Sequence, residues 1–163
     1  MNILTHSMLT LLAVASLAGP AQAKYNGEDR GRPVLPAQVS ATWQRECASC
    51  HLAFAPGLLP AASWQKIMQG LDKHFGTDAS LSPQDTAEIT QFLLQNPSNR
   101  WTSKTAPLRV TDTEWFKAKH IHSGKIAASV WQRASVKSPS NCMACHSGAD
   151  KGIFDEHGIK IPQ

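Results

Sequence analysis

The first 23 residues of the chain lack lysine, arginine, aspartate and glutamate altogether, although the whole sequence carries 16 basic and 12 acidic residues. Their apolar run, from Met8 to Ala18, is shorter than the ~20 residues that a membrane-spanning helix needs. Gly19 and Pro20 break the run ahead of Ala21-Gln22-Ala23, which is typical of a signal-peptide cleavage site. We therefore predict a cleaved signal peptide over residues 1–23 and a periplasmic mature chain that does not span the membrane.

Strict alternation of apolar and polar residues, the pattern of a half-buried β-strand, is missing from the mature chain. Apolar residues instead recur at helical spacing between Ala61 and Phe75. Ser82-Pro83-Gln84-Asp85 predicts a helix start with a hydroxyl cap, a first-turn proline and an acid. Thr111 to Glu114 predicts the cap of a later helix that extends to His120. These patterns predict an all-α fold.

The charge is unevenly distributed, and no dense cluster of lysine and arginine is present. Residues 24–96 hold six bases and seven acids, whereas residues 97–163 hold ten bases and five acids. An exported chain without a basic cluster does not suit nucleic acid. The basic C-terminal half suits an acidic protein partner, although an ordinary solvated surface accounts for it equally well.

Cysteine is scarce, and all four cysteines fall into two C-x-x-C-H motifs. The motifs are Cys47-Ala48-Ser49-Cys50-His51 and Cys142-Met143-Ala144-Cys145-His146. This pattern is the attachment signature of c-type haem. One helical turn places two thiols against the two vinyl groups of a porphyrin, and the adjacent histidine can ligate the iron. We therefore predict two covalently bound haem c groups, held by the four cysteines and ligated by the two motif histidines.

Other roles for paired cysteines explain the pattern less well. Two local disulfides, or one redox-active dithiol, require no histidine after each pair. The two C-x-x-C pairs of a zinc site normally lie ~15–20 residues apart, whereas 91 residues separate Cys50 from Cys142.

Each iron needs a second axial ligand, and the mature chain offers few histidines and methionines for that role. The candidates outside the motifs are Met68, His74, His120, His122 and His157. His74 follows the first motif closely and points off the apolar face of its predicted helix, which favours it for an iron. His120 follows Phe116 by four residues and shares its apolar side, whereas His122 lies about 200° further round the helix. Met68 is better interpreted as a core residue, and His157 as an exposed one.

Segments around these histidines resemble the small dihaem cytochrome c family. In the N-terminal half they are Glu46 to His51, Pro56 to Pro60, Ser63-Trp64, His74-Phe75-Gly76 and Ala79-Ser80. In the C-terminal half they are Trp115-Phe116, His120, Val130-Trp131, Asn141 to His146 and Gly152 to Asp155. The resemblance covers nearly all of the mature chain.

The resemblance implies bis-histidine ligation of both irons, with His51 and His146 from the motifs and His74 and His120 as distal ligands. It also implies low reduction potentials and an electron carrier rather than an enzyme. His122 stays open as an alternative to His120, and so does the assignment of each distal histidine to one iron. Redox partners implied by the family are a small oxygen-binding monohaem cytochrome and a membrane cytochrome b.

We therefore expect a compact, two-lobed, all-α monomer with short helices and long loops. A polar, proline-bounded stretch from Asn96 to Pro107 predicts the junction between an N-terminal haem lobe, residues 24–96, and a C-terminal haem lobe, residues 97–163. The alternative function is a dihaem enzyme or a gas-binding sensor in which one haem is five-coordinate or exchanges a ligand. The ample supply of histidines argues against that alternative.

Overall fold

Helices and turns make up the described part of the chain in this computed structural model, which covers residues 33–99 and 105–163. Within those ranges there is no β-strand, only an isolated bridge between His74 and Thr77, and the all-α prediction is confirmed. The predicted signal peptide lies outside the described residues. None of the described helices has the length and apolarity that a bilayer span requires. The division into lobes at residues 96 and 97 stays a prediction.

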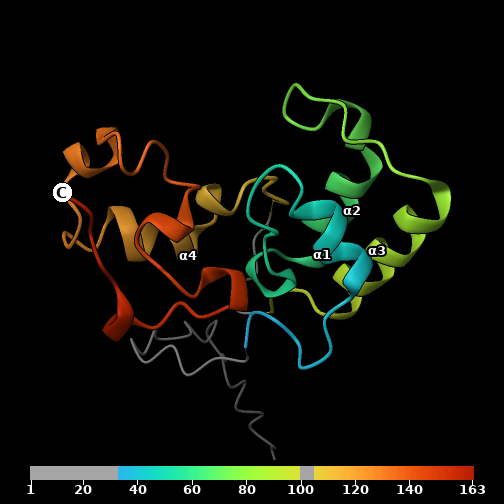
Figure 1. Ribbon diagram of the computed structural model, residues 1–163, viewed down its shortest axis with the longest axis horizontal. Helices are drawn as coiled ribbons and strands as arrows, with labels where there is room; N and C mark the ends of the chain where they lie inside the picture. Colours follow the sequence, from blue (N-terminus) through green and yellow to red (C-terminus); the bar gives the residue numbers. More distant parts are fainter. Residues whose placement is uncertain (1–32, 100–104) are drawn as a thin grey trace, which may run out of the picture. The chain divides into compact units, whose positions relative to one another are not determined.

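Three α-helices surround the main apolar core: α1 (Ala41–Cys47), α2 (Ala61–Gln69) and α3 (Pro83–Gln95). Both α1 and α2 pack against α3 (Figure 1). Buried side chains from the helices and from the loop between α1 and α2 fill the space between them. They include Trp43, Leu58, Leu59, Trp64, Met68, Ile89 and Leu93. Met68 is therefore a core residue, as the sequence predicts.

Hydroxyl caps begin two of these helices. Ser40 accepts a hydrogen bond from the backbone N–H of Trp43 at 3.0 Å, and Ser82 accepts one from the N–H of Asp85 at 3.1 Å. Pro83 occupies the first turn of α3, where its missing N–H costs no helical hydrogen bond. The predicted start of α3 is confirmed.

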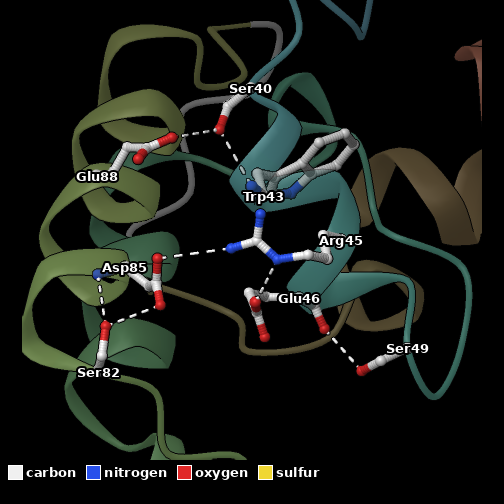
Figure 2. A network of polar contacts seen from close by, with 8 residues as sticks. All are labelled: Ser40, Trp43, Arg45, Glu46, Ser49, Ser82, Asp85 and Glu88. Carbon is white, nitrogen blue, oxygen red and sulfur yellow. Dashed lines mark hydrogen bonds and ion pairs between the residues drawn. The ribbon is translucent and has the colours of Figure 1, made fainter.

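Exposed polar contacts join α1 to α3 (Figure 2). Ser40 donates a hydrogen bond to Glu88 at 3.0 Å. Arg45 pairs with Glu46 at 2.7 Å and with Asp85 at 3.6 Å. Exposed pairs of this kind add little stability, but they neutralise Arg45, a cation close to the first haem motif.

The helix α2 is shorter than the sequence predicts, because it ends at Gln69 instead of reaching Phe75. Gly70 leaves the helical conformation with φ −123° and ψ 30°. A single 3₁₀ turn, η2 (Leu71–Lys73), follows and reverses the chain. His74 therefore lies on a turn beyond the helix and not on its face, which corrects the basis on which it was predicted as a ligand.

The predicted helix around His120 is present in an altered form. It begins at Thr113 and not at Thr111, because residues Val110–Asp112 form a separate 3₁₀ turn, η3. Thr113 accepts a hydrogen bond from the N–H of Phe116, which caps the short α4 (Glu114–Phe116). The chain then continues as a π-helical turn, η4 (Lys117–Ile121), a rare geometry that is frequent at functional sites.

Only short 3₁₀ turns follow α4 and η4. They are η5 (Ala128–Gln132), η6 (Cys142–Ala144), η7 (Ala149–Lys151) and η8 (Glu156–Gly158). Few apolar side chains are buried in this part of the chain, and several large ones are exposed. The exposed ones are Ile121, Met143, Ile153, Ile159 and Ile161.

A buried hydrogen bond links α2 to the loop that follows the first motif. The indole of Trp64, which is 6% exposed, donates to the carbonyl oxygen of Pro56 at 2.7 Å. We expect Trp64→Phe to lower the free energy of unfolding by about 2 kcal/mol, because the buried carbonyl loses its donor. Urea denaturation of the haem-loaded protein measures this loss. Trp43→Phe is the control, since Trp43 packs on Phe92; equal losses from both substitutions would contradict the role of the hydrogen bond.

Candidate functional site

The first motif begins at the end of α1. Cys47 is the last residue of that helix and is partly buried, whereas Cys50 and His51 are exposed. The Nδ1 atom of His51 lies 2.8 Å from the carbonyl oxygen of Leu52. Because a carbonyl oxygen can only accept, Nδ1 carries the proton and Nε2 keeps its lone pair for a metal.

His74 faces His51. The two imidazole centroids are 6.1 Å apart and their planes differ by 23°. A tight turn presents His74: the N–H of Thr77 donates to the His74 carbonyl at 3.0 Å. Both central residues have positive φ, 49° at Phe75 and 97° at Gly76, which is the type I′ pattern. Phenylalanine is a strained choice at the first of these positions, where asparagine, aspartate or glycine is usual.

His120 lies beside the histidine of the second motif. The centroids of His120 and His146 are also 6.1 Å apart, with planes at 65°. The Nδ1 atom of His120 lies 3.1 Å from the carbonyl oxygen of Phe116, so its Nε2 is likewise left for a metal. Its ring stacks on Phe116 with centroids 4.1 Å apart, and Trp131 lies 6.4 Å away. Aromatic packing therefore fixes the orientation of this imidazole.

The other candidate ligands lie elsewhere. His122 is exposed at the end of η4, and the side chain of His157 is fully exposed. The structure thus brings His120, and not His122, next to a motif histidine.

Burial favours the neutral form of three of the four paired histidines, His74, His120 and His146, and the neutral form is the one that ligates a metal. Burial lowers the pKa of His74, and the nearby His51 and Arg109 lower it further. Burial also lowers the pKa of His120 and of His146, although a hydrogen bond to Phe116 opposes the effect in His120 and Asp155 opposes it in His146.

The four thiols are unpaired with one another. Burial raises the pKa of both Cys47 and Cys142 to about 11. These leading cysteines are therefore protonated at neutral pH. Within residues 33–99 and 105–163, no three histidine, cysteine or acidic side chains gather around a point that could hold a bare metal ion.

The spacing of the histidine pairs fits an iron between each pair. A coordinating imidazole nitrogen lies about 2.0 Å from a metal and about 1.2 Å from its own ring centre, so two imidazoles on opposite sides have centroids roughly 6.4 Å apart. Both observed separations, 6.1 Å, are close to this value. The exposed apolar side chains of the C-terminal half also supply a surface that a porphyrin could cover.

One cavity of about 330 Å³ lies between residues of both motifs. His51 and Leu52 line it on one side, and Ser140, Asn141 and Met143 line it on the other. Residues of the first motif and of the second therefore border the same space.

The sequence analysis assigned no role to three residues that contact the paired histidines or their neighbours, although Phe154 lies in one of the segments that resemble the family. Phe54 lies 5.5 Å from His51, and Phe154 lies 5.4 Å from His146, measured between ring centroids. The guanidinium of Arg109 lies 4.0 Å above the ring of Phe75. Only Phe54, three residues after the motif histidine, could have been inferred from spacing.

Comparisons with known proteins identify the family of this chain. Residues 43–154 match the family described as dihaem cytochrome c. A diheme cytochrome c from Rhodobacter sphaeroides is 34% identical, covers 71% of this chain and 97% of its own, and superposes with a TM-score of 0.65. A diheme cytochrome type c from Shewanella baltica OS155 is 38% identical, covers 75% of this chain and 92% of its own, and superposes with a TM-score of 0.64. A search of curated proteins finds no match. The chain therefore belongs to the dihaem cytochrome c family, whose members are haem-based electron-transfer proteins.

Proposed function

We propose that this chain is a periplasmic c-type cytochrome that carries electrons at low potential between redox proteins. Its two haems would be held covalently by the two motifs, through Cys47, Cys50, Cys142 and Cys145. The observation that carries the proposal is the matching separation of the two histidine pairs, 6.1 Å in each.

In this proposal His51 and His74 ligate one iron, and His146 and His120 ligate the other. When bound, each haem supplies the one-electron couple of its iron. The chain's own contribution is to bring the four imidazoles together in two pairs and, through the Nδ1 contacts of His51 and His120, to leave Nε2 of these two available. Two nitrogen ligands favour ferric iron more than a methionine does, which keeps the reduction potential low. If both histidines of each pair ligate, no position on either iron would be left for a peroxide or a gas, and this favours a carrier over a dihaem enzyme or sensor.

The shared cavity supports two closely spaced haems. His51 of the first motif and Met143 of the second line the same space, together with Asn141, which directly precedes the second motif. Close spacing would let the two groups exchange an electron within one molecule, so the protein could accept two electrons in succession.

We further propose that the partner is an acidic redox protein, with a small monohaem cytochrome or a membrane cytochrome b as the family-based candidates. The C-terminal half carries ten basic and five acidic residues. Several of its lysines are exposed, among them Lys137, Lys151 and Lys160. Docking through such charges is transient, involves the monomer, and weakens as salt increases.

A spectroscopic redox titration of the exported protein tests this function. We expect two haems per chain, a ferric spectrum that is entirely low-spin, and two one-electron steps at low potential, because each iron has two histidine ligands. A high-spin fraction equal to one haem would contradict the carrier and support the enzyme or sensor.

A further inference from the structure

We propose that Arg109 is a positioning residue for the first haem: it stacks on Phe75, holds the strained turn that presents His74, and places a positive charge beside that ligand. This inference rests on the proposed function, since it takes His74 to be an iron ligand. It assigns Arg109 two separable effects, one mechanical and one electrostatic.

The contacts form a continuous chain from Arg109 to the motif. The Cζ atom of Arg109 lies 4.0 Å from the ring centroid of Phe75. The ring of Phe75 lies edge-on to His74, with centroids 4.8 Å apart, and His74 in turn faces His51. A single aromatic ring therefore separates the guanidinium from the imidazole of His74.

The turn has a reason to need support. Phe75 adopts φ 49°, a conformation that bulky residues rarely occupy, and its side chain is 47% exposed. The edge-on contact with His74 leaves the faces of this exposed ring without support from its own turn. The planar guanidinium covers one face of that ring, an arrangement that attracts the cation to the π electrons.

The backbone of Arg109 is anchored well enough to provide this support. The next residue, Val110, is 8% exposed and belongs to the same buried cluster as Ile89 and Leu93 of α3. The hydroxyl of Thr113 donates a hydrogen bond to the Val110 carbonyl at 2.7 Å. A segment far along the sequence from His74 thus fixes the cation above the turn.

Among the described residues no carboxylate pairs with Arg109, whereas Arg45 near the first motif pairs with Glu46 and Asp85. An unpaired cation near an iron favours the reduced form, which carries one positive charge fewer, and so raises the reduction potential of that haem. The effect decreases with salt because the guanidinium is exposed.

Substitutions in the haem-loaded protein separate the two effects. Arg109→Gln is expected to lower the potential of one haem and leave the other unchanged. It should also raise the affinity of added imidazole for that haem about two- to fivefold, the loss expected from one exposed cation–π contact. Arg109→Lys keeps the charge and should restore the potential. Phe75→Leu removes the ring, keeps the cation, and should raise imidazole affinity with a smaller change in potential.

Arg45→Gln/Glu46→Gln is the charge-conserving control, because it removes an arginine near the first motif together with one of its carboxylate partners. It should leave both potentials unchanged. The inference is overturned if Arg109→Gln changes neither the potential nor the imidazole affinity, or if Arg45→Gln/Glu46→Gln shifts the same haem equally. His74→Ala separates this failure from that of the proposed function: if both haems stay low-spin in that variant, the ligand assignment itself is wrong.

Discussion

Replacing His120 with alanine is expected to convert one of the two haems, and only one, from low-spin to high-spin. The imidazole of His120 lies 6.1 Å from that of His146, with its Nε2 left free by the hydrogen bond to Phe116. Alanine removes the sixth ligand, and the packed rings of Phe116 and Trp131 offer no substitute. Absorption and electron paramagnetic resonance spectra of the ferric protein should show a high-spin component equal to half of the haem. Added imidazole should reverse it.

The control is His122→Ala, which removes an imidazole two residues away that is exposed at the end of η4. Its spectrum should match that of the unchanged protein. His120→Met gives a second readout, because a thioether ligand favours ferrous iron and should raise the potential of that haem alone. The assignment of His120 would be wrong if His120→Ala stayed fully low-spin or if His122→Ala produced the high-spin component.

Short-range patterns predicted the N-terminal helices well. The start of α3 depends on a serine cap, a first-turn proline and an acid, all within four residues of one another. Such a signal acts locally, and tertiary packing has little reason to override it. The apolar spacing of α2 was equally visible, although its end was not, because Gly70 ends the helix with a reversal that the periodicity does not register.

The candidate site also has a part that the sequence predicts and a part that it does not. The two C-x-x-C-H motifs specify their own thiols and histidines, and a short inventory of remaining histidines leads to His74 and His120. Which imidazoles face each other depends on contacts between segments distant in sequence. His51 and His74 are brought together by the reversal after α2, whereas His120 is oriented by a π-helical turn and by stacking on Phe116. No local pattern predicts a π-helical turn.

The contact by which Arg109 supports the turn could not be predicted either, because it also joins segments that are distant in the sequence. Arg109 and Phe75 are far apart in the sequence, and neither lies in a motif. Their contact depends on Val110 entering the core formed by α1, α2 and α3. A positive φ at a phenylalanine is also contrary to its local preference, so it is evident only in the structure.

Removing the first haem attachment and removing the second are expected to destabilise the protein unequally, and this prediction has the largest expected effect on stability. Cys142→Ala/Cys145→Ala and Cys47→Ala/Cys50→Ala should each leave one haem per chain, measured by mass spectrometry as the loss of one haem mass. The N-terminal helices supply most of the main core, including Trp43, Ile89 and Leu93, and the C-terminal half adds only Val110 to its buried residues. The C-terminal half has few buried side chains and several exposed apolar ones.

The second motif should therefore matter more for folding than the first. We expect Cys142→Ala/Cys145→Ala to lower the free energy of unfolding by at least about 3 kcal/mol. Without the porphyrin, several large apolar side chains would be exposed to water, and each would contribute about 1 kcal/mol or more to this loss. Hydrogen exchange can locate the loss: amide protection should disappear from α4, η4 and η5 while α3 stays protected. The Cys47→Ala/Cys50→Ala variant is the matched comparison and should keep protection in α3. Loss of α3 protection in the second-motif variant would show that the two halves fold as one cooperative unit, and the proposed asymmetry would then be wrong.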